Sequence, residues 1–290
     1  MSVKVTLDIF SGRPNPIVVL RDAQARELLE RLGPQRRLEQ GEPGLPPEPP
    51  LGYRGLVIEQ TDATGGDLPG RFRVIGADVF GAGLSHRARD EAVEDLLIGP
   101  EGMLWQKVDP ELRSVVRAER RRLAEIRAVS TAGPVPAFWT TPCRSAPLYE
   151  PAWWNATPRV WENNCYNYGT NYRTDTFAQP GLAADAMYKE LTGAAVLPAA
   201  EADQLINVPG ADNRCPLEGQ LVALVIWPDM DFHWYRKGRT GTWSHKPGGT
   251  PVTAMDNAGH TILDPRTADR GPYSEFTTFM VVMHGHIKIR

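Results

Sequence analysis

One cysteine and two later histidines are the residues of this sequence whose types and spacing suit nucleophilic chemistry. Cys165 stands in the polar and aromatic segment WENNCYNY, and His233 and His245 follow in strand-like segments. A thiol is a useful nucleophile only as the thiolate, and a neighbouring imidazole or a helix N-terminus lowers its pKa from about 8.5. If the histidines fold back on Cys165, the chain is a cysteine hydrolase.

The spacing of the two histidines suits neighbouring strands of a hairpin. His245 lies twelve residues after His233, and a turn-forming segment at 237–242 separates them. Paired strands place the two rings side by side, so that one takes the thiol proton and the other orients it through the far ring nitrogen. A structural interpretation stands beside this one, in which Cys165 is a buried thiol and each histidine is a hydrogen-bonded strand residue.

These features resemble papain-like hydrolases of the NlpC/P60 and CHAP type, in which a cysteine at a helix start faces a histidine on a sheet. The order of cysteine and histidine matches, and GQLV at 219–222 is similar to the Gly-Asp-Leu-Val strand of NlpC/P60, with Gln220 in place of the aspartate. The pair Asn-Cys with Tyr168 three residues on looks more like CHAP, and the Asp-Cys-Ser/Thr-Gly motif of NlpC/P60 is absent. The resemblance covers residues 161–246 and implies a bacterial thiol peptidase or amidase.

By this resemblance Cys165 is the nucleophile, His233 the general base and acid, and His245 the residue that orients the imidazole. Other residues are placed to orient the ring instead, namely Asp231, Asp256 and Asn257. The oxyanion needs the backbone N–H of the cysteine and one side-chain donor. The residues predicted to form the oxyanion or substrate-binding site are Asn163, Asn164, Tyr166, Tyr168, Trp161, Trp154 and Asp231.

Aromatic residues flank the cysteine on both sides, and they suit the wall of a cleft and a hydrophobic core equally well. The members of this aromatic set are Trp153, Trp154, Trp161, Tyr166, Tyr168 and Tyr172.

Composition excludes several classes of function. The formal net charge is −3 with both signs interspersed, so no electrostatic footprint for nucleic acid stands out, and the basic run 117–127 is typical of a solvated helix face. No apolar run approaches the roughly 20 residues that span a bilayer. No cofactor or metal motif is recognised, so we expect neither. The N-terminus lacks the features of a Sec signal peptide, which predicts a cytoplasmic protein and leaves secretion by another route open.

The sequence predicts an α+β protein of two domains. Residues 1–129 form a small α+β accessory domain, residues 130–160 a connector rich in proline and aromatic residues, and residues 161–290 a papain-like domain with a helix-borne cysteine packed on an antiparallel sheet. Helices are predicted at 23–32 with Asp22 as the N-cap, and at 87–97, 110–129 and 183–191. Strands are predicted at 3–10, 53–59, 71–79, 221–227, 232–236, 241–246, 277–283 and 286–289. An exposed proline-rich loop is predicted at 41–50.

Three cysteines are too few for a disulfide scaffold, although a bridge between Cys143 and Cys215 would leave Cys165 free. We predict a hydrolase or acyltransferase that acts on an amide or peptide bond through a Cys165 thioester, with a peptide, a peptidoglycan fragment or a small amide as substrate. The alternative is a non-catalytic binding or interaction module, with an aromatic recognition surface and a structural Cys165.

Overall fold

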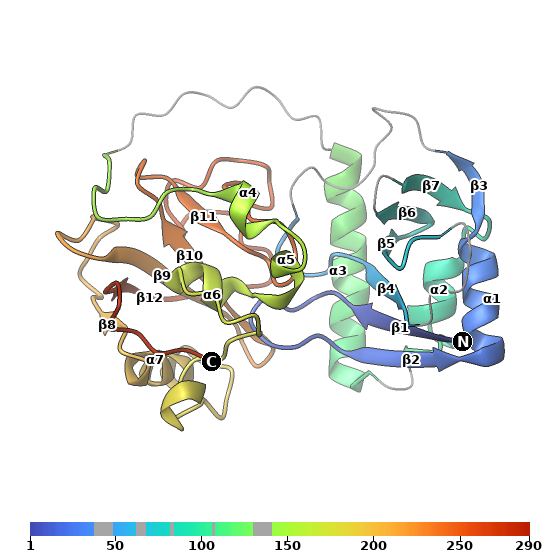
Figure 1. Cartoon of the computed structure of the whole chain (residues 1–290), viewed down its shortest axis with the longest axis horizontal. Coiled ribbons are helices and arrows are strands. Elements are labelled where there is room, and N and C mark those ends of the chain that lie inside the picture. Colours follow the sequence, from blue (N-terminus) through green and yellow to red (C-terminus); the bar gives the residue numbers. More distant parts are fainter. Residues whose placement is uncertain (38–48, 62–67, 82–83, 106–107, 130–140) are drawn as a thin grey trace. The chain divides into compact units, whose positions relative to one another are not determined.

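The structure is a computed structural model that describes residues 1–37, 49–61, 68–81, 84–105, 108–129 and 141–290 (Figure 1). The predicted loop at 41–50 and connector at 130–160 lie partly outside these residues. The chain forms two compact units. The first consists of Met1–Ile9, Asn15–Pro47 and Tyr53–Ser130, and the second of Phe10–Pro14, Glu48–Gly52 and Thr131–Arg290. Each unit combines helices with its own antiparallel sheet, so the predicted α+β class is confirmed.

The first unit is built on a seven-stranded sheet with the order β2-β1-β4-β5-β6-β7-β3. Its strands are β1 (Ser2–Leu7), β2 (Ile17–Arg21), β3 (Pro34–Arg37), β4 (Leu56–Gln60), β5 (Arg71–Ile75), β6 (Asp78–Gly81) and β7 (Leu84–Ala88). Its helices are α1 (Asp22–Leu32), α2 (Val93–Ile98) and α3 (Pro110–Val129). Alternate residues of β1 are buried, as a sheet with one covered face requires.

The predicted helix α3 is confirmed at its bounds, and α1 begins one residue early because Asp22 is its first residue and not its N-cap. Several strand bounds were wrong. The predicted strand at 71–79 is two strands, because Gly76 has a φ of 61° and turns the chain between β5 and β6. The predicted helix at 87–97 is shorter, since its first residues belong to β7 and pair with β6. The strand β2 at Ile17–Arg21 was not predicted.

The second unit contains a five-stranded antiparallel sheet with the order β11-β10-β9-β12-β8. Its strands are β8 (Ile206–Asn207), β9 (Gln220–Trp227), β10 (Asp231–Lys237), β11 (Trp243–His245) and β12 (Glu275–Val282). Its helices are α4 (Pro151–Trp154), α5 (Arg159–Glu162), α6 (Cys165–Thr170), the short 3-10 helix η2 (Leu182–Ala184) and α7 (Gly193–Ala202). Helix α6 packs on β10 and α7 packs on β9, and every residue of β9 and β10 is buried.

Two predicted elements of this unit are wrong. In place of a helix at 183–191 the chain forms η2 and then turns at Asp185, whose φ is 54°, and the helix begins at 193 after a Thr192 cap. No strand forms at 286–289, although Ile287 and Ile289 are buried. Within the described residues, no helix combines the length and apolar character that a membrane span requires.

A buried ion-pair cluster of the first unit joins β5 to the residue that follows β1 and to the segment before β4. The carboxylate of Asp8 lies 2.6 Å from Nη2 of Arg54 and 2.7 Å from Nη1 of Arg73. Burial alone would raise the pKa of Asp8, but the two guanidinium groups outweigh it and hold the pKa at about 2. The cluster therefore stabilises the fold only while its members remain charged and paired.

We expect Arg54→Met to lower the free energy of unfolding by about 3 kcal/mol, because it removes one partner of a buried ion pair. Urea unfolding of the full chain measures this loss. The contribution of Asp8 is present at neutral pH and disappears as the pH falls from about 4 toward its folded pKa of about 2. Arg31→Met, in an exposed pair with Asp90, is the control and should have little effect. Equal losses in both variants would contradict the prediction.

Candidate functional site

Cys165 begins helix α6 because the residue before it caps the helix. The side-chain oxygen of Asn164 accepts hydrogen bonds from the N–H groups of Tyr166 and Asn167, each at 3.1 Å. The side chain of Asn167 in turn accepts the N–H of Asn164 at 3.0 Å, which completes a capping box. The thiol then faces β10, with Sγ 3.9 Å from the carbonyl oxygen of Phe232.

The two histidines lie on neighbouring strands and contact one another. Nε2 of His233 on β10 is 2.9 Å from Nδ1 of His245 on β11, and Nδ1 of His233 is 2.6 Å from the hydroxyl of Ser11. Nε2 of His245 is 3.0 Å from the carbonyl oxygen of Met255. The result is a buried chain of hydrogen bonds from a serine to a backbone carbonyl.

The carbonyl group of Met255, at the end of this row of hydrogen bonds, fixes which nitrogen atoms carry the protons. The carbonyl of Met255 can only accept, so Nε2 of His245 donates to it and Nδ1 of the same neutral ring accepts. Nε2 of His233 therefore donates to His245, and Nδ1 of His233 accepts the hydroxyl proton of Ser11. Both nitrogens of His233 are occupied in this arrangement, Nδ1 by Ser11 and Nε2 by His245.

Burial makes the thiol of Cys165 a weak acid. Cys165 has no solvent exposure, and burial, together with the nearby Asp231 carboxylate, raises the pKa of the thiol to about 12. The hydroxyl of Ser11 and the ammonium of Lys246 oppose this effect without reversing it. A thiol of this kind stays protonated at neutral pH and is a poor nucleophile.

Asp231 attaches the short segment Phe10–Pro14 to the second unit. Its carboxylate accepts the backbone N–H groups of Ser11, Gly12 and Arg13 at 2.5 to 3.2 Å. The hydroxyl of Tyr273 donates a further hydrogen bond at 2.5 Å. Burial raises the pKa of Asp231, and these donors counteract that rise. The carboxylate of Asp231 therefore holds a peptide segment, and its roles in orienting His233 or in binding a substrate stay predictions.

The segment fits closely against the residues around the cysteine. Gly12 lies on the ring of Phe232, and a Cβ at this position would be 2.4 Å from a ring carbon, so only glycine fits without displacement. The carbonyl of Gly12 accepts hydrogen bonds from Nδ2 of Asn164 at 2.6 Å and Nε2 of Gln179 at 2.9 Å. The surroundings of Cys165 are filled by the chain itself.

The predicted oxyanion donors are engaged elsewhere. The amide of Asn163 bonds Asp175 and backbone groups of the following loop. The hydroxyl of Tyr166 donates to Asp203 at 2.9 Å, and that of Tyr168 lies 2.6 Å from the hydroxyl of Ser244. The structure gives each of these side chains a structural partner, and their assignment to an oxyanion site stays a prediction.

The predicted aromatic set divides into buried and exposed members. Trp154, Tyr166 and Tyr168 are buried, and Trp154 packs edge-on against Tyr168. Trp153 and Trp161 are exposed to 43 % and 38 %. Some members of the set therefore belong to the hydrophobic core, and others lie on the surface of the protein.

Sequence reasoning missed Ser11, Gly12, Lys246 and Tyr273, which complete this site. Ser11 lies 222 residues from the histidine that it contacts, so no local spacing could identify it. The Ser-Gly-Arg-Pro turn was the available signal, but it indicates only a change of chain direction. Among the residues that the structure describes, no group of three or more histidine, cysteine, aspartate or glutamate side chains suits a metal ion.

A disulfide joins Cys143 to Cys215, with the Cα atoms 5.4 Å apart and a sequence separation of 72 positions. Cys165 is the free cysteine. Disulfides persist in oxidising compartments and are rare in the cytoplasm.

Comparison with known proteins gives one informative relative. The chain is 46 % identical over 136 residues to the insoluble matrix shell protein 1 of Ruditapes philippinarum, and the match covers 46 % of this chain and 88 % of that protein. No family model and no solved structure matches the chain.

This relative overturns several predictions. A shell matrix protein of a mollusc is neither a bacterial protein nor a thiol protease, so the predicted membership of the NlpC/P60 or CHAP hydrolases and the predicted enzyme activity are wrong. The predicted cytoplasmic location is also contradicted, because a shell matrix lies outside the cell. The findings favour the non-catalytic alternative. The occupied histidine and the weakly acidic thiol give this correction a physical reason.

We expect native Cys165 to react with iodoacetamide at pH 8 about 1000-fold more slowly than the unfolded chain, because a pKa of about 12 leaves little thiolate. Mass spectrometry of timed samples measures the rate, and Cys165→Ala gives the background. Comparable rates for the folded and unfolded chains would show that the thiol is accessible and that its pKa is not raised, and would contradict the prediction.

We expect Cys143→Ser/Cys215→Ser to lower the free energy of unfolding by about 4 kcal/mol, because the bridge closes a long loop in the unfolded chain. Urea denaturation with and without reductant measures the effect. Reductant should shift the midpoint of the wild type and leave that of the double variant unchanged. A wild-type midpoint that is insensitive to complete reduction is the contrary result.

Proposed function

The chain belongs to the family of the insoluble matrix shell protein 1, and we propose that it is a non-catalytic structural protein of an extracellular matrix. The identity to this relative is the observation that carries the proposal. The disulfide between Cys143 and Cys215 supports a location outside the cytoplasm. In this role the protein associates with other matrix components and not with a peptide or amide substrate.

The second unit supplies the binding module of this proposal. A helix that begins at a cysteine and packs on an antiparallel sheet is the layout expected of a papain-like domain, and residues 161–290 are its predicted extent. We assign it a scaffolding role, in which Ser11, His233 and His245 form a fixed hydrogen-bonded core. Residues 1–129 are the accessory domain.

The exposed aromatic side chains of α4 and α5, with the tyrosine before them, are the proposed contact surface. Tyr149, Trp153 and Trp161 are exposed to 42 %, 43 % and 38 %, and we call them the aromatic surface. The guanidinium of Arg159 lies 3.7 Å from the ring centroid of Trp153, and the ring of Trp154 packs edge-on against it at 4.8 Å. A ring held in this way loses little conformational entropy when a ligand covers it.

The chemistry of such rings favours an insoluble polymer with apolar faces as the partner. Tryptophan and tyrosine present a large rigid area together with a polar edge, which suits a surface that is partly wet. The ring faces of a polysaccharide present C–H groups that stack on indoles, while its hydroxyls bond the polar rim. We therefore take the polysaccharide fraction of a matrix as the binding partner.

We expect Trp153→Ala/Trp161→Ala to weaken binding to chitin about ten-fold, because it removes two rigid aromatic anchors. The full chain is mixed with chitin particles and with the acid-insoluble residue of decalcified clam shell, and the protein left in solution is measured after sedimentation. Cys165→Ala should bind as well as the wild type, because Cys165 is buried and does not belong to the aromatic surface.

The matched control is Ile206→Ala/Leu217→Ala, which truncates two exposed apolar side chains of the same unit outside the aromatic surface. Its binding should equal that of the wild type. Wild-type protein that sediments with neither material would overturn the proposal. Binding to shell residue but not to chitin would reject the polysaccharide as the partner.

A further inference from the structure

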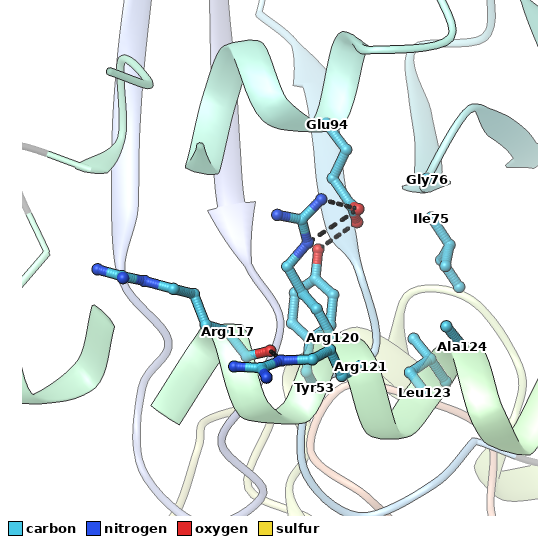
Figure 2. A pocket seen from close by; sticks show the side chains of 9 residues that line it. All are labelled: Tyr53, Ile75, Gly76, Glu94, Arg117, Arg120, Arg121, Leu123 and Ala124. Carbon is cyan, nitrogen blue, oxygen red and sulfur yellow. Dashed lines mark hydrogen bonds and ion pairs between the residues drawn. The ribbon is translucent and has the colours of Figure 1, made fainter. Parts of the chain in front are cut away.

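A hollow of about 410 Å³ lies in the first unit between helices α2 and α3 and the end of β5. The residues that line it are Tyr53, Ile75, Gly76, Glu94, Arg117, Arg120, Arg121, Leu123 and Ala124. Figure 2 shows the arginines on one side and Ile75, Leu123 and Ala124 on the other. This volume falls within the range of small-molecule sites.

One of the three arginines is neutralised within the protein. Arg120 donates from Nε and Nη2 to the carboxylate of Glu94 at 3.1 and 2.8 Å, and it also contacts Asp95 at 2.8 Å (Figure 2). The other oxygen of Glu94 accepts the hydroxyl of Tyr53 at 2.5 Å. The acidic group of the hollow is therefore fully engaged, and it does not repel a second anion as a free carboxylate would.

The other two arginines retain their charge. Within the described part of the chain, no carboxylate forms an ion pair with Arg117 or Arg121. They stand four residues apart on α3, a spacing at which like charges repel and destabilise a helix. The guanidinium of Arg117 lies 5.0 Å from the ring centroid of Trp105, which restricts its motion. The pair is thus a partly fixed positive charge at the edge of a hollow.

Another part of the hollow is apolar. Leu123, which is almost fully buried, and Ala124 lie further along α3, and Ile75 at the end of β5 adds aliphatic surface. A lining that contains both two guanidinium groups without a carboxylate partner among the described residues and an aliphatic part suits a ligand that has both an oxyanion and an apolar body. Planar guanidinium forks bind carboxylate and phosphate oxygens by paired hydrogen bonds.

We infer that the hollow between α2 and α3 is a binding site for a small organic anion, with Arg117 and Arg121 holding its carboxylate or phosphate and Ile75, Leu123 and Ala124 covering its apolar body. The site is independent of the aromatic surface of the second unit. Bound anion also relieves the repulsion between the two arginines, so binding should stabilise the first unit.

Isothermal titration of the full chain with phenyl phosphate, benzoate, inorganic phosphate and phenol tests the site. We expect saturable binding of phenyl phosphate or benzoate, at least about ten-fold tighter than the binding of inorganic phosphate or phenol. Only phenyl phosphate and benzoate carry both an oxyanion and an apolar ring. The comparison of phenyl phosphate with benzoate identifies the preferred oxyanion. No saturable binding of either below about 10 mM overturns the inference.

Arg117→Ala/Arg121→Ala should weaken the binding of the preferred probe at least about ten-fold. Arg117→Lys/Arg121→Lys keeps the positive charge and should retain part of the affinity. The matched control is Arg21→Ala/Arg26→Ala, which removes the same charge from exposed positions of the same unit. If the control weakens binding as much as the site variant, the effect is general electrostatics and the inference fails. The midpoint temperature of thermal unfolding should rise when the probe is added to the wild type, and it should not rise for the site variant.

Discussion

The carboxylate of Asp231 is the interaction on which the second unit depends. It is buried at the start of β10 and collects three consecutive backbone N–H groups from residues 11–13 and the hydroxyl of Tyr273. Burying a carboxylate without partners costs free energy because the group loses its bound water, and four hydrogen-bond donors offset that cost for Asp231. Together with the bonds from Asn164, Gln179 and His233, this side chain makes a segment from the beginning of the chain part of a core formed by residues more than 150 positions later.

The same segment fills the surroundings of the cysteine and the two histidines that were predicted to be catalytic. Catalysis through Cys165 requires a thiolate, an imidazole nitrogen open to its proton and room for a substrate. Ser11 and His245 bond the two nitrogens of His233, and Gly12 lies on Phe232, whose carbonyl oxygen is 3.9 Å from the thiol. Residue types and order suggested the chemistry, but they could not reveal a peptide segment that comes from far away in sequence and supports the proposed non-catalytic role.

The spacing of apolar residues correctly predicted the elements that have a regular apolar pattern in the sequence. Helices α1 and α3 and strand β9 carry clear apolar patterns, and the hairpin of β10 and β11 follows from the spacing of its histidines. The helix expected at 183–191 failed because Asp185 adopts a left-handed conformation that composition does not reveal. Ser11 could not be found for a different reason, since its role arises only when distant segments meet. Burial also decided the character of Cys165, because a polar sequence around a thiol does not show whether water reaches it.

The state of the three cysteine sulfur atoms limits how the chain can be joined covalently to other molecules. Two of them are joined in the bridge from Cys143 to Cys215, and the third, on Cys165, is enclosed by protein. The folded chain thus offers no thiol for linkage to neighbouring molecules. In the proposed matrix role, retention of the chain rests on non-covalent contacts or on bonds made by other side chains, and denaturant without reductant is then sufficient to extract whatever is held by contacts alone.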